Sequence, residues 1–162
     1  TTCSLTLSPR PLVFPRYVFI SFPSGMPFPS DYMQLFNASA IALKAVDSSL
    51  RIGGPATMQL INAAEFVTAC QTAEPPIPFD FVSTHMYPTD PQCPQKDNWG
   101  PDCLPSKVKE LRAKIDKKIP LLITEYNVGC CLNYQQHDTS GAAAFAFRTI
   151  PQLVGVVDVL SW

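Results

Sequence analysis

Helical and strand patterns alternate along most of this chain, and that alternation limits the folds it can adopt. Stretches with apolar residues at helical spacing are followed by short, almost wholly apolar runs typical of buried strands. We expect helices at about 31–47, 58–71, from 106, and from 138 or 139 to about 150, and strands at 50–52, 79–84, 121–124 and 154–160. Because parallel strands need crossover connections, this order predicts an α/β protein whose parallel sheet is covered on both faces.

Two architectures fit this order, a doubly wound sheet and a (β/α)8 barrel. A complete barrel takes about 250 residues, so the pattern in residues 31–162 amounts to about half of one. The first 30 residues differ, because closely spaced prolines make regular structure improbable apart from one short strand near Tyr17. We therefore expect a chain cut at both ends. In this interpretation 1–30 form an irregular arm that can be foreign to the fold, and 31–162 form the C-terminal half of a barrel.

Composition excludes several classes of partner. The chain has 12 basic and 13 acidic residues without a basic cluster, which argues against nucleic acid. No run approaches the roughly 20 apolar residues of a membrane span, so we expect no membrane partner. Cys and His spacing does not suit a metal site, and we expect neither metal nor cofactor. A disulfide between Cys93 and Cys103 would restrain the loop between them, which favours a secreted or extracellular protein.

Chemically useful side chains follow the predicted strands, at the edge where parallel α/β folds collect their functional groups. In chain order these residues are Gly54, His85, Tyr87, Glu125, Asn127 and Trp162. A carboxylate, an imidazole, a phenol and an indole on one rim suit a sugar site, because aromatic faces pack on C–H surfaces and polar groups bind hydroxyls. Gly54 lies where a tight turn would allow close backbone approach.

Glu125 is the strongest indication of a functional site, because a charged residue that closely follows the apolar run 121–123 is expected to have a specific role. It is either a structural carboxylate or a catalytic one. His85 and Tyr87 share a side of their strand, so they either orient Glu125 and a sugar hydroxyl or belong to the core. Trp162 fits a sugar platform and a core position equally well. Retaining glycoside hydrolysis needs two carboxyl groups, and no other acid follows a strand suitably.

Three segments together resemble glycoside hydrolase family 39, which holds β-xylosidases and α-L-iduronidases: LRIGGPAT at 50–57, DFVSTHMYP at 80–88 and ITEYN at 123–127. The resemblance implies strands five to eight of a barrel, with Glu125 matching the nucleophile at the end of strand seven. His85 and Tyr87 match residues that contact substrate and nucleophile, and Trp162 matches the start of the eighth-strand motif. The family's acid/base, a Glu in an Asn-Glu pair ending strand four, should precede Asp31, but the arm contains no such pair.

These observations predict a β-xylosidase-like retaining glycoside hydrolase that cleaves terminal glycosidic bonds of a carbohydrate substrate. Glu125 would attack the anomeric carbon, and a Glu absent from this chain would serve as acid/base. Alone, the chain is expected to be inactive and to associate with a missing N-terminal half-barrel, because half a barrel exposes strand edges. The alternative is a non-catalytic carbohydrate-binding or interaction module derived from such a barrel.

Overall fold

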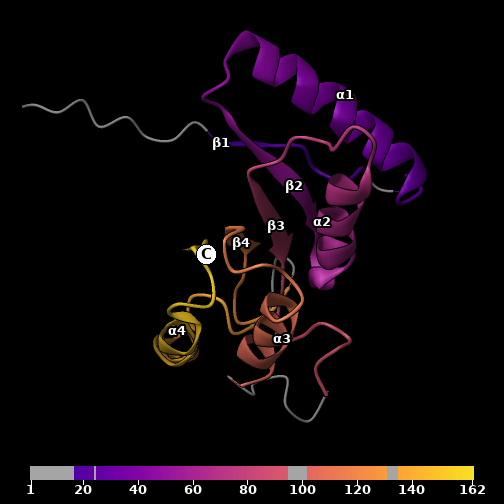
Figure 1. The fold of residues 1–162 in the computed structure, drawn as a ribbon. Coiled ribbons are helices and arrows are strands. Elements are labelled where there is room, and N and C mark those ends of the chain that lie inside the picture. The colour runs from indigo at the N-terminus through magenta and orange to yellow at the C-terminus, as the bar shows by residue number, and fades with distance from the viewer. Residues whose placement is uncertain (1–16, 24, 95–101, 131–134) are drawn as a thin grey trace, which may run out of the picture.

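One parallel sheet organises the part of the chain that the computed structural model describes, residues 17–23, 25–94, 102–130 and 135–162. Its strands pair in chain order: β1 (Tyr17–Phe19), β2 (Arg51–Thr57), β3 (Phe81–His85), β4 (Leu121–Glu125) and β5 (Val159–Leu160). The connecting helices are α1 (Ser30–Val46), α2 (Ala63–Thr72), α3 (Cys103–Arg112) and α4 (Ser140–Leu153). Figure 1 shows these helices as an arc around the sheet. Strand order without reversal is that of a partial (β/α) barrel and not of a doubly wound sheet.

The segment before α1 contributes to this sheet. β1 pairs with β2 in parallel, and the pairing continues when Ile20 and Phe22 donate their backbone N–H groups to β2 carbonyls at 3.0 and 2.8 Å. β1 is the short strand that the sequence allowed near Tyr17. Residues 1–16, the first part of the proline-rich arm expected at 1–30, lie outside the described residues. The division of the chain at residue 30 therefore stays a prediction.

β2 differs from the sequence prediction, which ended the strand at residue 52 and made Gly53 and Gly54 a tight turn. The strand instead continues through both glycines to Thr57. A Cβ atom on Gly53 would overlap the backbone oxygen of Phe81, and one on Gly54 would overlap the Tyr32 hydroxyl. These glycines therefore permit close packing against β3 and α1, which is why the turn prediction was wrong.

The chain turns only after β2 has ended. Gln59, Leu60 and Asn62 have φ values of 59°, 58° and 59°, in the left-handed region that non-glycine residues seldom occupy. They interrupt the helix expected at 58–71, leaving a short 3₁₀ turn and then α2 from Ala63. The apolar spacing of this segment predicted the helix but not the break, because Gln and Leu seldom adopt positive φ and Asn62 alone is a weak signal.

The remaining helices begin at or near the expected positions. Thr139 is the N-cap of α4, and its Oγ1 accepts the backbone N–H of Ala142 at 3.4 Å, which confirms one of the two predicted caps. α3 begins at Cys103, earlier than the cap expected at Ser106. Pro105 does not prevent this, because the first turn of a helix leaves its N–H groups without intrahelical partners.

The last strand is shorter than predicted. The apolar run from Val154 suggested a strand up to Leu160, but Gly155 has a φ of 73° and the backbone N–H of Val156 returns to the carbonyl of Leu153 at 2.9 Å. This turn leaves only two residues in β5. The apolar pattern of the turn resembles a strand because Val156 and Val157 pack against the core.

Two aspartates fasten the strands at their N-terminal ends. The Asp80 carboxylate accepts the N–H of Ile52 at 2.8 Å, and the Asp80 N–H donates to the Ile52 carbonyl at 2.7 Å. Asp158 repeats this arrangement with Leu121, at 2.8 and 2.9 Å. Asp158 is thus a structural polar contact. We call these two pairs the aspartate hooks; they lie at the edge opposite to the C-terminal strand ends.

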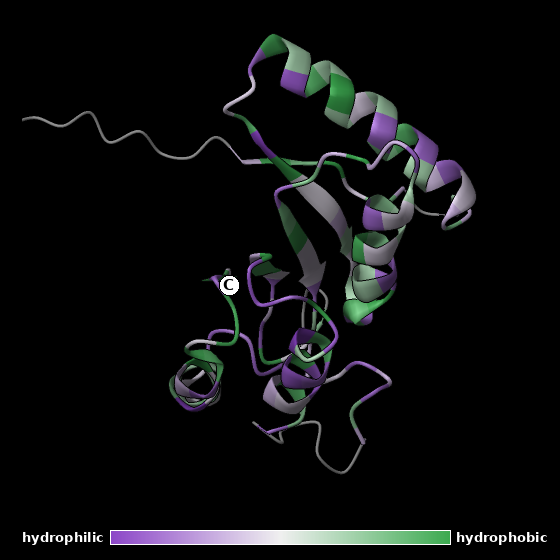
Figure 2. Cartoon of the chain, in the orientation of Figure 1, coloured by the Kyte–Doolittle hydropathy of each residue, from purple (hydrophilic) through white to green (hydrophobic). Residues whose placement is uncertain are grey.

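The core lies between the sheet and the arc of helices, and Figure 2 shows hydrophobic and hydrophilic bands alternating along the helices. Its largest fully buried side chains include Tyr32, Phe36, Phe66, Ile52, Met86, Leu104 and Ile123. Among the described residues, the helices are too short or too polar to cross a membrane.

Candidate active site

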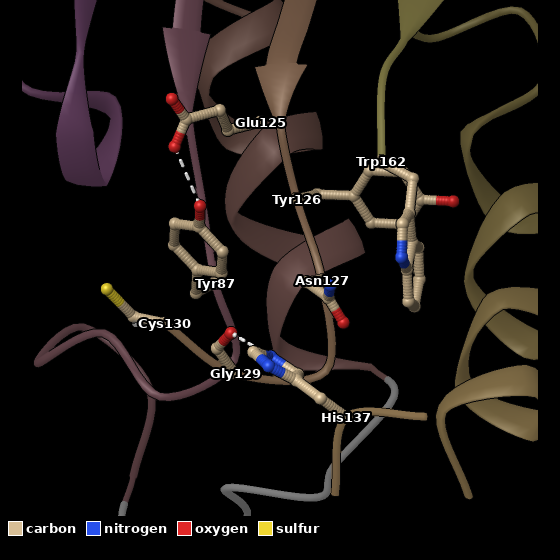
Figure 3. A pocket seen from close by; sticks show the side chains of 8 residues that line it. All are labelled: Tyr87, Glu125, Tyr126, Asn127, Gly129, Cys130, His137 and Trp162. Atoms are coloured by element: carbon tan, nitrogen blue, oxygen red, sulfur yellow. Dashed lines mark hydrogen bonds between the residues drawn. The ribbon is translucent and has the colours of Figure 1, made fainter. Parts of the chain in front are cut away.

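β3 and β4 end beside each other, with His85 opposite Glu125 in the register of the sheet. The Tyr87 hydroxyl donates to Glu125 Oε2 at 2.7 Å (Figure 3), and His85 Nδ1 lies 3.5 Å from the same oxygen. Oε1 of Glu125 takes no part in either contact. Two neighbouring strands thus hold one carboxylate by one of its oxygens and leave the other for a ligand, in a side chain that is 56% exposed.

The surroundings fix the protonation states of the groups that hold Glu125. Burial, the hydrogen bond to Glu125 and its negative charge raise the pKa of Tyr87, so the phenol stays protonated and donates. Burial lowers the pKa of His85, against the opposing effects of Glu125 and Asp90, so the imidazole is neutral at pH 7. Glu125 therefore accepts a hydrogen bond from the neutral Tyr87 phenol, and neither Tyr87 nor His85 carries a positive charge.

Asp90 supports the segment that carries Tyr87. Its carboxylate accepts the Tyr87 N–H at 2.8 Å, while the Asp90 N–H donates to the Tyr87 carbonyl at 3.1 Å. Asp90 is only 7% exposed, and burial raises its pKa although the Tyr87 N–H and His85 act in the opposite direction. No role was predicted for Asp90 from the sequence; the available signal is the segment Tyr-Pro-Thr-Asp at 87–90, in which Pro and Asp favour a turn.

The predicted disulfide between Cys93 and Cys103 is confirmed, and it secures the same region. Cys93 donates its backbone N–H to the Asp90 carbonyl at 2.8 Å, and Cys103 is the first residue of α3. The disulfide therefore connects the turn that follows Tyr87 to α3, which packs on the sheet. It acts on the site by limiting the movement of Asp90 and Tyr87.

A pocket of about 380 Å³ opens beside Glu125. Figure 3 shows the side chains that line it: Tyr87, Glu125, Tyr126, Asn127, Gly129, Cys130, His137 and Trp162. Trp162 is 55% exposed, and its ring meets that of Tyr126 edge-on at 5.0 Å. Among these described lining residues, Glu125 supplies the single carboxylate. An exposed indole beside a carboxylate suits a ligand with one apolar face and several hydroxyl groups.

The structure brings most of the predicted site residues together. Tyr87, Glu125, Asn127 and Trp162 line the pocket, and His85 contacts Glu125. Gly54 does not line it, because this glycine packs in β2 against the first helix. The roles assigned to these residues from the sequence remain predictions.

Tyr126 also lines this pocket; the sequence placed it in the strand-end segment 123–127 without giving it a role. Three further lining residues were missed: Gly129, Cys130 and His137. They follow β4 in a segment without helical or strand periodicity, so no pattern indicated where their side chains lie. His137 is held near the pocket by a 3.0 Å contact between Nε2 and the Gly129 carbonyl. Within the described residues, no three His, Cys, Asp or Glu side chains gather in a way that would hold a metal ion.

A curled parallel sheet with a carboxylate at the C-terminal end of a strand defines a barrel-type α/β protein with an enzyme-like rim. Residues 25–162 match the sequence model of the Glycosyl hydrolases family 39. The chain belongs to that family.

Individual relatives agree with this assignment. The chain is 33% identical over 130 residues to a β-xylosidase of Caldicellulosiruptor saccharolyticus, covering 76% of this chain and 26% of that protein. It is 31% identical over 148 residues to a β-xylosidase of Geobacillus stearothermophilus, covering 82% and 29%. A monomeric β-xylosidase from Caulobacter crescentus CB15 shares the fold with a TM-score of 0.69 and 28% identity, over 80% of this chain and 28% of that one. The chain thus spans less than a third of the length of these relatives.

Proposed function

We propose that this chain is part of a retaining glycoside hydrolase that cleaves a terminal β-xyloside-type bond, with Glu125 as its nucleophile. The observation that carries the proposal is the 2.7 Å hydrogen bond from the Tyr87 hydroxyl to Glu125 Oε2, with His85 Nδ1 at 3.5 Å. The substrate class follows from the relatives, which are named β-xylosidases.

The proposed first step is an attack by Glu125 on the anomeric carbon. A carbon–oxygen bond forms to the carboxylate, the glycosidic bond breaks, and the leaving oxygen takes a proton from a second carboxylic acid. That second group then accepts a proton from water, which hydrolyses the glycosyl ester. Tyr87 and His85 would hold Oε2 so that the other oxygen faces the sugar, and Trp162 would support the sugar ring from the side of the pocket.

The same proposal assigns β2 to β5 to strands five to eight of the barrel and Glu125 to the end of strand seven. β1 precedes β2 in the sheet and would then be strand four, where the family resemblance expects an Asn-Glu pair. β1 is followed by Ile20, Ser21 and Phe22 instead. With no carboxylate at that strand end, the acid/base would have to come from elsewhere in a complete protein.

That strand end favours a second candidate function, a non-catalytic carbohydrate-binding module. Ser21 and Phe22 lack an acidic group, and Glu125 is the single carboxylate among the described residues of its pocket. Such a module would hold a xyloside between Trp162 and Glu125 without cleaving it.

Mechanism-based labelling distinguishes the two candidates. We would treat the chain with 2,4-dinitrophenyl 2-deoxy-2-fluoro-β-xyloside, whose leaving group needs no protonation, so that Glu125 is tested without an acid/base. The expected result is one fluoroxylosyl group on the peptide containing Glu125. The label should be absent in Glu125→Gln and unchanged in Glu65→Gln, a control on the exposed face of α2. A xyloside that binds measurably but leaves no label would replace the hydrolase with the binding module.

A further inference from the structure

A second pocket, also of about 380 Å³, lies at the ends of β2 and β3, beside the segment that follows β1. We call it the β2 pocket. Its lining includes Phe22, Thr57, Met58, Ile61, Asn62 and His85. Phe22, Met58 and Ile61 are apolar, the Thr57 hydroxyl is already bonded to the Ile61 carbonyl, and Asn62 and His85 supply the remaining polar groups. The composition differs from that of the Glu125 pocket, where tyrosine, tryptophan and polar groups predominate.

The turn after β2 presents apolar side chains at this pocket. Met58 and Ile61 are 63% and 45% exposed, although both are hydrophobic. The backbone that carries them includes the positive φ values at Gln59 and Asn62, and the Thr57 hydroxyl donates to the Ile61 carbonyl. Left-handed backbone at such residues costs energy, so the turn is maintained by its surroundings. Its effect is to hold two apolar side chains open to solvent beside a cavity.

His85 joins the β2 pocket to the candidate active site. Its ring lines the β2 pocket, and its Nδ1 is 3.5 Å from Glu125 Oε2. Neighbouring strands are about 4.8 Å apart, so the ends of β2 and β4 are separated by about 10 Å. That distance accommodates one monosaccharide ring and its glycosidic oxygen. A xyloside whose anomeric carbon faces Glu125 would therefore direct its other end toward the β2 pocket.

The chemistry of displacement gives the same direction. When Glu125 attacks the anomeric carbon in a retaining reaction, the leaving oxygen departs from the opposite face of the sugar. The group attached to that oxygen then points away from β4 and across the rim. β2 lies two strands from β4 in the order of the sheet, within reach of a group that extends across the rim.

We propose that the β2 pocket binds the leaving group of the glycoside, and that it selects an apolar aglycone, aryl or alkyl, over a second sugar. The proposal rests on the proposed function of the Glu125 pocket. A second sugar would bury hydroxyl groups against Phe22, Met58 and Ile61 without enough hydrogen-bond partners, whereas an aromatic ring would replace water on all three.

Paired non-hydrolysable ligands test this selectivity in the full chain. Phenyl 1-thio-β-xyloside and thio-linked xylobiose, whose aglycone is a second xylose, differ only in the aglycone, and isothermal titration gives the affinity of each. The additional apolar area of the phenyl group predicts about tenfold tighter binding. Ile61→Asn and Met58→Gln should each reduce this preference to about threefold or less. Ile150→Asn is the matched control, because Ile150 is 46% exposed on α4, far along the chain from the β2 pocket.

The outcomes separate this inference from the function on which it rests. Loss of the phenyl preference in both pocket variants, with the control unchanged, supports the proposal. Equal binding of the two xylosides, or a preference that survives both substitutions, overturns it while xyloside binding itself stands. Failure of both ligands to bind overturns the proposed function as well. A change of oligomeric state caused by Ile61→Asn, without a change in the preference, would identify a contact between chains and also overturn the proposal.

Discussion

Replacing Gly54 with alanine is expected to lower the free energy of unfolding by about 2–4 kcal/mol. The new Cβ would overlap the Tyr32 hydroxyl and lie 2.8 Å from the Ile20 carbonyl oxygen. Overpacking of this kind costs about 1–3 kcal/mol. The displaced hydroxyl would also lose its 2.7 Å hydrogen bond to the Ile20 carbonyl, which contributes about 1 kcal/mol.

Urea unfolding followed by circular dichroism measures this cost, and a second background isolates its cause. In Tyr32→Phe the overlapping hydroxyl is already absent, so Gly54→Ala should cost at least about 1 kcal/mol less there than in the parent. Xyloside affinity should not change, because Gly54 does not line the Glu125 pocket. A cost below about 0.5 kcal/mol, or an equal cost in both backgrounds, would refute the packing argument. Weaker sugar binding by a folded variant would instead support the substrate-binding role expected from the sequence.

Three further predictions follow from the site and its supports. Tyr87→Phe should slow fluoroxylosyl labelling of Glu125 about tenfold, because the free energy of a hydrogen bond to a half-exposed charged group is at the low end for charged groups. An unchanged labelling rate would show that the hydroxyl does not position the carboxylate. Replacing Cys93 and Cys103 with serine should lower the free energy of unfolding by about 2–3 kcal/mol, because the disulfide closes a loop with a sequence separation of 10. Equal urea midpoints for the double variant and the parent would contradict this prediction. Burial lowers the pKa of His85, so below about pH 6.5 the unfolded chain binds a proton that the folded chain does not. The free energy of unfolding therefore decreases as the pH is lowered. Melting temperatures should show a smaller fall between pH 7 and pH 5 in His85→Gln, and an identical fall would exclude His85 as its source.

The central strands were predictable because burial leaves a simple pattern. Leu121, Leu122 and Ile123 are all at most 2% exposed in β4, and a parallel strand covered on both faces must be apolar at successive positions. In β3 the apolar pattern is limited to its first two residues, because the buried residues that follow them, Ser83 and Thr84, are polar. The helices that cover these strands repeat apolar residues at helical spacing, so their existence was predictable and their ends less so.

The glycines and the turn after β2 were not predictable in this way. Adjacent glycines usually indicate a turn between two elements. Only the positions of Phe81 and Tyr32 show why the strand needs Gly53 and Gly54. Similarly, the break at Asn62 depends on backbone angles that its neighbours in space maintain. Local sequence carries little information about such tertiary constraints.

The residues of the candidate site also differ in whether the sequence could locate them. Tyr87 and Glu125 could be located from the rule that parallel strands present chemistry at their C-terminal ends. Asp90 was missed, because it holds the backbone of a turn and does not itself line the pocket. His137 is brought to the pocket by a segment without periodicity, and its position emerges only from the three-dimensional path of the chain.

The aspartate hooks have a consequence for how a protein of this kind can change over evolutionary time. Asp80 and Asp158 set the register of neighbouring strands from the edge remote from Glu125. Loops at the Glu125 edge can therefore be lengthened, shortened or exchanged without moving the strands beneath them. The contacts that hold the strands and the loops that can vary thus lie at opposite ends of the same strands, so the rim can change while the fold stays constant.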